Sequence, residues 1–273
     1  MITIINRKEG ERMSDYITAA NLELIVKQNE KIKDSIKKKL LLLMEQYNLR
    51  EGIKSEEKLA FKILKQHGLI QLPIENTYWS GAIYYRGDKK IPVINTALPR
   101  MNQFFTAWHE VYHLIYGEDE MTNIYQISSD LTLAERKADY FAAKALMGNV
   151  YSYYVELNGD DFMDKIAQCM DMYQVPYKAI LIQLYEDAKS ADNLRLMKEI
   201  KENFDRKDQD WVVYFRRLGL DEELVTPSNV VNISYLEGKI KRRKDEEAEV
   251  SIHELNERYF MSLKERINKI MKE

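Results

Sequence analysis

The chain has 273 residues, of which 45% are hydrophobic and 31% charged, so it can bury the core of one large or two modest soluble domains. Its formal net charge of −3 gives no overall attraction to nucleic acid or to an anionic membrane, and we expect neither direct DNA binding nor membrane association. The single cysteine, Cys169, excludes an intrachain disulfide and predicts a cytoplasmic protein with a buried, structural thiol. The N-terminal stretch MITIINRKEGERMSDY is too polar for a signal peptide, and the aliphatic run Leu40–Met44 is too short to span a bilayer.

The first part of the chain is predicted to be helical. Apolar residues recur at helical spacing from about Tyr16 to Tyr47, and Ser55 begins a second helix that ends before Gly68. We therefore assign residues 1–54 to an N-terminal helical extension.

Residues 78–96, YWSGAIYYRGDKKIPVINT, differ from this helical pattern. Two β-rich runs, Ala82 to Tyr85 and Ile91 to Asn95, flank a Gly-Asp turn and predict an antiparallel hairpin. Pro92 lacks a backbone donor, which is typical of an edge strand.

The rest of the chain is predicted to be helical, and its sequence contains no internal repeat. Helices are predicted over roughly 102–116, 132–147, 160–173 and 176–188, with further segments up to the end. A shift to charged composition near Ala188 separates a main domain at 55–187 from a C-terminal helical region at 188–273. The basic run in KIKRRKDEEAE (239–249) is followed at once by acidic residues, which is typical of a solvated helix or linker. The plan is α+β, mostly helical with a small antiparallel sheet.

The stretch FFTAWHEVYHLIYG (104–117) carries two of the four histidines. On a helix, His109 and His113 lie one turn apart on the same face, so both imidazoles can point at one tetrahedral zinc ion. Glu110 lies beside them, where its carboxylate can act as a general base without being a ligand. This is the H-E-x-x-H pattern of zinc peptidases.

The same helix also has an apolar side, formed by Phe105, Trp108, Tyr112 and Ile115, that would dock it into a core. The histidines are not part of that stripe. A pair of structural core histidines nevertheless stays open as the alternative to a metal site.

A catalytic zinc site needs a third protein ligand, and a carboxylate is the best candidate. His67 and His253 lie outside any pattern, and Glu118 to Glu120 follow the helix too closely, as a solvated acidic turn. In LTLAERKADYFAAKALMG, Glu135 and Asp139 share a helix face that is bordered by small residues. Glu135 can complete the metal shell, and Asp139 can accept the free N–H of a ligand histidine and fix its tautomer.

Glu135 also has a structural interpretation. Thr132-Leu-Ala-Glu135 fits a capping box, in which the glutamate bonds the first amide of its own helix. The metal and capping roles both stay open at this point.

Together, IPVINTALPRMNQFFTAWHEVYHLIYG and LAERKADYFAAKALM resemble the ImmA/IrrE metallopeptidases, over about residues 55–187. The segment DKIAQCMDMYQVPYKAILIQLYE resembles the helix-turn-helix-like part of that family. Tyr112 replaces the usual glycine, Asp139 the usual asparagine and Gly148 the usual proline.

The resemblance implies a zincin-like fold and a zinc-dependent endopeptidase with Zn²⁺ on His109, His113 and Glu135. It also implies a narrow protein substrate, typically a helix-turn-helix repressor of a mobile element or stress locus. The strand Ile91–Asn95, as an exposed edge, would hold this substrate by strand addition. The alternative is a regulatory protein that keeps the zincin fold but acts by binding rather than by cleavage. A third possibility, a toxin-like peptidase restrained by a partner, differs mainly in its biology.

Overall fold

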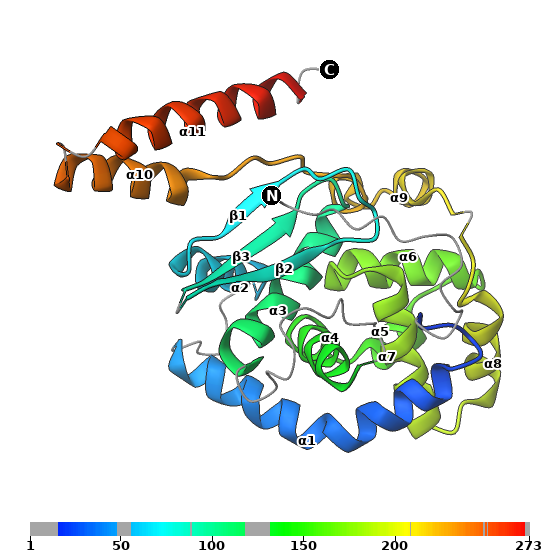
Figure 1. Ribbon diagram of the computed structural model, residues 1–273. Helices are drawn as coiled ribbons and strands as arrows, with labels where there is room; N and C mark the ends of the chain where they lie inside the picture. The colour runs from blue at the N-terminus through cyan, green and yellow to red at the C-terminus, as the bar shows by residue number, and fades with distance from the viewer. Residues whose placement is uncertain are drawn as a thin grey trace.

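The structure is a computed structural model that describes residues 16–47, 56–87, 89–117, 132–207, 209–247, 249 and 251–270. Most of these residues are helical, and one small sheet completes an α+β fold (Figure 1). The fold class predicted from the sequence is therefore confirmed. Within the described ranges, no helix is both long and apolar enough to cross a membrane.

Helix α1 (Leu22–Gln46) lies along one side of the molecule, across α4 and α7 (Figure 1). Its periodic apolar residues form one buried face, which is why a sequence rich in lysine still folds onto the core. Helix α2 (Glu56–Gln66) packs on α3 and ends before Gly68, whose φ of +84° favours glycine. A Cβ atom at Gly68 would lie only 2.2 Å from the ring of Tyr235, so the C-terminal part of the chain packs on this turn.

The sheet has three strands, β1 (Ile70–Leu72), β2 (Gly81–Arg86) and β3 (Lys89–Asn95). The predicted hairpin is confirmed, because β2 and β3 pair antiparallel around Gly87. However, β1 pairs parallel with β3 and the strand order is β1-β3-β2. The small sheet, predicted to be antiparallel, is therefore mixed, and the placement of Ile91–Asn95 at an edge was wrong.

Pro92 is tolerated in this central strand because of where the parallel pairing begins. The amide of Asn95 faces β2, where it donates to the carbonyl of Ser80, and the amide of Thr96 faces β1, where it donates to Leu72. Since the backbone N–H groups of a strand point alternately to its two sides, the backbone nitrogen of residue 92 faces β1. The pairing with β1 starts only at Val93, so the donor that proline lacks would have no partner strand there.

The remaining elements are helical. They are α3 (Arg100–Tyr116), α4 (Leu133–Leu146), α5 (Val150–Glu156), α6 (Phe162–Tyr173), α7 (Tyr177–Ser190), α8 (Leu194–Asn203), α9 (Trp211–Leu218), the 3₁₀ turn η2 (Glu222–Val225), α10 (Ser234–Glu246) and α11 (Ser251–Ile270).

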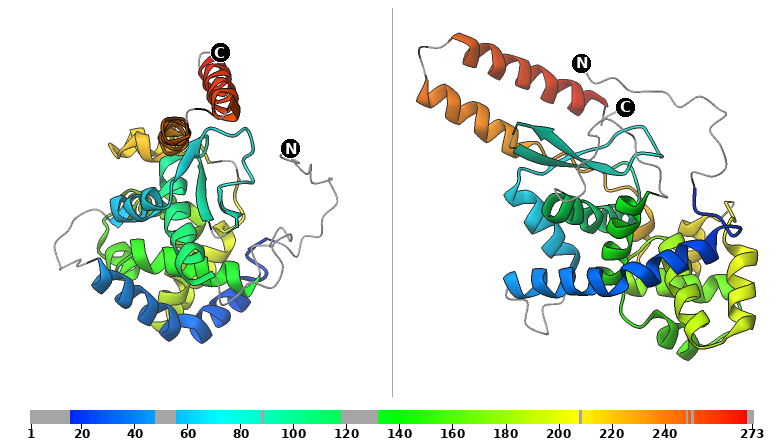
Figure 2. Two further views of the ribbon diagram at one scale, coloured as in Figure 1. Left: turned by 60° about the vertical axis from the view of Figure 1, so that its left-hand side comes forward. Right: turned by 60° about the horizontal axis from the view of Figure 1, so that its bottom comes forward.

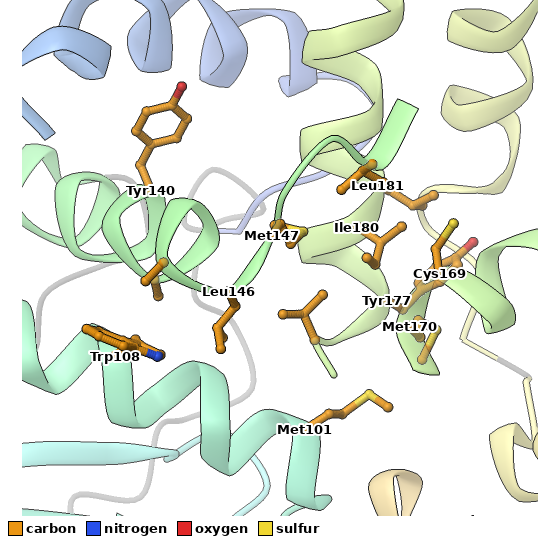
Figure 3. Close-up of a cluster of buried hydrophobic side chains, with 14 of the residues drawn as sticks. Met101, Trp108, Tyr140, Leu146, Met147, Cys169, Met170, Tyr177, Ile180 and Leu181 are labelled. Atoms are coloured by element: carbon orange, nitrogen blue, oxygen red, sulfur yellow. The ribbon is translucent and has the colours of Figure 1, made fainter. Parts of the chain in front are cut away.

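Part of the hydrophobic core lies where α3, α4, α6 and α7 meet (Figure 3), and α1 and α2 add further buried side chains to it. Trp108 and Tyr112 on α3 are fully buried, and their rings lie 6.0 and 5.5 Å from that of Phe141 on α4. Cys169 of α6 is also buried, and burial raises the pKa of its thiol to about 12. A thiol with that pKa is almost fully protonated at neutral pH, as expected for a structural cysteine.

The C-terminal region contacts the main domain at several points. Helix α8 packs on α7 and α9 packs on α6. The backbone of Asn232 forms a two-way bridge with Gln71 of β1, and the amide of Asn229 donates to the carbonyl of Thr96. After Asn232, helices α10 and α11 form a hairpin that projects from the rest of the described structure (Figure 2). The domain boundaries at 54/55 and 187/188 stay predictions.

The loop between β1 and β2 is held by the side chain of Asn95, which is fully buried at the end of β3. Its Oδ1 atom accepts hydrogen bonds from the amides of Ile74 and Ala97. Its Nδ2 atom donates to the carbonyls of Ile74, Asn76 and Trp79. One amide group thus replaces the backbone partners that the loop lacks, and fixes the point at which β2 begins.

We expect the substitution Asn95→Leu to lower the free energy of unfolding by about 3 kcal/mol, because it leaves several buried backbone groups without partners. Urea unfolding followed by circular dichroism measures this loss. The same substitution at the exposed Asn256 of α11 serves as the control and should change stability by less than about 0.5 kcal/mol. Equal effects at the two sites would show that Asn95 does not hold the loop.

Candidate metal centre

Helix α3 carries both histidines and passes between the sheet, α2 and α4 (Figure 1). The side chains of His109 and His113 are 17% and 19% exposed, so they lie at the border between the core and solvent. Their Nε2 atoms are 3.1 Å apart. The i, i+4 spacing therefore points both imidazoles at one place, as the sequence indicates.

Helix α4 brings a carboxylate to the same place. Ala138 and Ala142 are fully buried, and such small side chains let α4 approach α3 closely. One carboxylate oxygen of Glu135 lies 3.1 Å from His109 Nε2, and the other lies 3.5 Å from His113 Nε2.

The helix cap and the carboxylate position of Glu135 are compatible. Thr132 is the N-cap residue of α4, and its hydroxyl accepts a hydrogen bond from the backbone amide of Glu135 at 3.3 Å. This bond uses only the backbone of Glu135, while its carboxylate lies beside the histidines. Thr132 therefore fixes the start of the helix that carries the third candidate ligand.

These three side chains have the donor set and spacing of a metal site. One ligand atom from each of His109, His113 and Glu135 lies within 4.8 Å of the other two, and the separations quoted above run from 3.1 to 3.5 Å. Two ligands on a tetrahedral zinc ion, each about 2.0–2.1 Å from it, are about 3.3 Å apart. The cluster is therefore compatible with a metal ion, and two imidazoles with a carboxylate suit zinc.

Asp139 lies one turn after Glu135 and contacts the other side of His109. Its Oδ1 atom is 2.9 Å from His109 Nδ1, which leaves Nε2 to face the other ligands. Burial lowers the pKa of His109, but hydrogen bonds from this imidazole to Asp139 and Glu135 outweigh it and raise that pKa well above its ordinary value. Burial likewise raises the pKa of Glu135, but the two histidines outweigh it and hold that pKa well below its usual range.

Glu110 faces the same region from α3 and is only 4% exposed. Burial raises the pKa of its carboxyl group, and the two neighbouring histidines offset part of this rise. A carboxylate with a raised pKa is suited to accept and then return a proton near neutral pH.

Gly81, at the start of β2, makes room for this carboxylate. A Cβ atom there would lie 2.6 Å from Thr106 Cγ2 and 3.2 Å from Glu110 Oε1. Only glycine therefore lets the strand pass so close to α3.

The other histidines lie elsewhere. His253 contacts Glu247 at 2.6 Å on the C-terminal hairpin, and His67 lies at the end of α2. The acidic residues 118–120, which the sequence analysis assigns to a solvated turn rather than to the metal, lie outside the described residues. Sequence reasoning missed Gly81, and also Arg136, whose guanidinium donates to Asp139, and Asn29, which accepts a hydrogen bond from Arg136. The only sequence signal for Gly81 is weak, namely a glycine next to a β-rich run. Arg136 and Asn29 have no such signal in the sequence.

The raised pKa of His109 predicts how metal affinity depends on pH. Zinc needs the neutral imidazole, so a proton on His109 competes with the metal. An ordinary histidine, with a pKa of about 6.5, no longer competes above pH 7.5 or so. We therefore expect the apparent zinc affinity of the wild type to keep rising above that pH. The substitution Asp139→Asn removes the carboxylate that stabilises the protonated imidazole of His109. The zinc affinity of this variant should therefore stop rising at a lower pH than that of the wild type. Competition with a chromophoric chelator between pH 6.5 and 9 measures both curves, and identical curves would contradict this account.

Comparison with known proteins agrees with this geometry. Residues 69–185 match the model of the IrrE N-terminal-like domain, a peptidase family, and this range contains both histidines, Glu110, Glu135 and Asp139. No curated protein and no solved structure matches the chain. The chain therefore carries, at residues 69–185, a peptidase domain of the ImmA/IrrE family.

Proposed function

We propose that the protein is a zinc-dependent endopeptidase that hydrolyses a peptide bond in a specific protein substrate. The observation that carries this proposal is the convergence of His109, His113 and Glu135, from two helices, beside the buried carboxylate of Glu110. A purely structural histidine pair would not need a buried general base next to it.

The residues of the centre have distinct roles in this proposal. Zinc held by His109, His113 and Glu135 would supply a Lewis acid that polarises a peptide carbonyl and makes water a better nucleophile. Glu110 takes a proton from the attacking water and returns it to the leaving amine. Its burial favours the protonated form, which helps it hold the proton between these two steps.

The substrate would bind along β2 rather than along β3. In the described part of the chain, β3 is central, β1 is bridged by Asn232, and β2 is the open edge. The first residue of β2, Gly81, lies against Glu110. An extended peptide that pairs with β2 would therefore pass next to the metal centre.

We further propose that the substrate is a helix-turn-helix repressor and that the protein acts in the cytoplasm without binding DNA itself. The paired helices α6 and α7 are joined by a turn at Gln174, but eight residues of α7 are buried, including Tyr177, Ile180 and Leu184. A helix covered in this way is not free to enter a DNA groove. In the C-terminal hairpin, Arg243, Lys244 and Lys264 pair with acidic side chains, which argues against a phosphate-binding surface.

The substitution Glu110→Gln tests the peptidase proposal. We expect the variant to keep zinc but to lose at least about 100-fold in cleavage rate, because the amide cannot accept a proton. The zinc-loaded protein is incubated with native host proteins, and new N-termini are identified by mass spectrometry; helix-turn-helix regulators should be among the proteins cut. Glu156→Gln, at an exposed position on α5, is the matched control.

Cleavage by a zinc-loaded Glu110→Gln variant at the wild-type rate would remove Glu110 from this role. If the zinc-loaded wild type cuts nothing but retains a regulator, the binding-protein alternative would replace the peptidase.

A second substitution tests the place of the substrate. Since amides alternate along β2, that of Ile83 points away from β3 and toward the open edge. Ile83→Pro removes this donor and should reduce cleavage at least about tenfold through KM, with zinc content unchanged. Ile83→Val keeps the donor and should cleave like the wild type. Equal cleavage by both variants would exclude substrate pairing along β2.

A further inference from the structure

A chain of buried and partly buried hydrogen bonds connects helix α1 to the candidate metal centre. Asn29 of α1 accepts a hydrogen bond from Arg136 Nη2 at 2.9 Å, and Arg136 Nη1 donates to Asp139 Oδ2 at 3.1 Å. The other oxygen of Asp139 lies 2.9 Å from His109 Nδ1. Asp139 is thus held on one side by the candidate ligand His109 and on the other by Arg136.

Arg136 is an unusual residue to find in this position, because it is only 2% exposed and still carries a charge. Burying a guanidinium group is costly unless it is paired and hydrogen-bonded. Within the described part of the chain its hydrogen bonds go to Asp139 and Asn29, and its buried Nε atom has no partner. The orientation of the guanidinium, and through it that of Asp139, therefore depends on Asn29.

Asn29 is in turn fixed by helix α7. It is fully buried, and its Nδ2 atom donates to Glu186 Oε2 at 3.3 Å. Glu186 also accepts a hydrogen bond from the hydroxyl of Tyr140 at 2.8 Å. These contacts leave the Oδ1 atom of Asn29 facing Arg136.

Helix α1 is itself firmly attached, although it lies outside the residues that match the peptidase family. Near its C-terminal end, the hydroxyl of Tyr116 donates to the carbonyl of Lys39 at 2.8 Å. The Lys39 ammonium lies 4.9 and 4.5 Å from the ring centres of Tyr112 and Tyr116. Both tyrosines belong to α3, the helix of the histidines, so α1 contacts the helices that carry the centre at two separate places.

We propose that α1 is a positioning element of the metal centre: Asn29 orients Arg136, Arg136 orients Asp139, and Asp139 holds His109 in the geometry that binds metal. This rests on the proposed metal centre and adds two positioning residues to it. Residues that orient a metal-binding histidine commonly change metal affinity 10- to 100-fold when they are replaced. The N-terminal region would then be required for full metal affinity rather than being an appendage.

The test compares metal binding by the full chain carrying Arg136→Lys, Asn29→Leu or Ile25→Ala. Lysine keeps the buried charge but cannot bond Asp139 and Asn29 with one planar group. Leucine keeps the volume of Asn29 but removes its acceptor. Ile25 lies one turn before Asn29 on the same helix and is also fully buried, so its replacement disturbs packing without touching the hydrogen bonds. Metal affinity is measured with zinc by chelator competition, and ligand geometry from the visible absorption of the cobalt(II) form, at a temperature where circular dichroism shows native helix content.

We expect Arg136→Lys and Asn29→Leu to weaken zinc binding by about tenfold and to shift the cobalt absorption bands, whereas Ile25→Ala leaves both unchanged. Wild-type affinity and an unchanged cobalt spectrum in either of the first two variants would overturn the proposal, and so would an equal loss in Ile25→Ala. If one variant does not fold, the other decides. A wild-type chain that binds neither metal would instead overturn the proposed metal centre, which is a distinguishable result.

Discussion

The close contact between helices α3 and α4 is the interaction on which the rest of the site depends. Two candidate ligands lie on α3 and the third on α4, and an ion can be shared only if the helices bring ligand atoms within a few ångströms. Buried alanines on α4 permit this approach, and the rings of Trp108, Tyr112 and Phe141 fix it from the core side. Because this packing is tight, a small displacement of the residues packed against α3 and α4 can shift the imidazoles of His109 and His113.

The features that the sequence predicted correctly are those with a local signal. Helical spacing placed His109 and His113 on one face, and the hairpin followed from two β-rich runs around a turn. The order of the strands had no such signal, because β1 has only three residues and its parallel partner lies more than 20 residues away. Without β1, β3 looked like an edge, and Pro92 strengthened that interpretation.

The supporting residues of the site could not be predicted, because their roles arise from contacts between distant segments. An arginine such as Arg136 in a charged helix is typical of a solvent-exposed face, but here it is buried, and α1 packs over the helix that carries it. Tyr112 is a related case: it is fully buried, and Lys39 of α1 lies over its ring. Helix α1 therefore contacts residues of the domain at 69–185 that support the site, and these contacts cannot be predicted from the sequence of either segment alone.

The identity of the metal ligands is tested most directly by X-ray absorption at the zinc edge of the purified, zinc-loaded protein. If two imidazoles and a carboxylate bind the zinc, the wild-type coordination shell contains only nitrogen and oxygen donors and shows the multiple-scattering pattern of two histidines. In His113→Ala, the pattern should correspond to one histidine. A shell with sulfur, or one that is the same in the wild type and in His113→Ala, would contradict a centre formed by His109, His113 and Glu135.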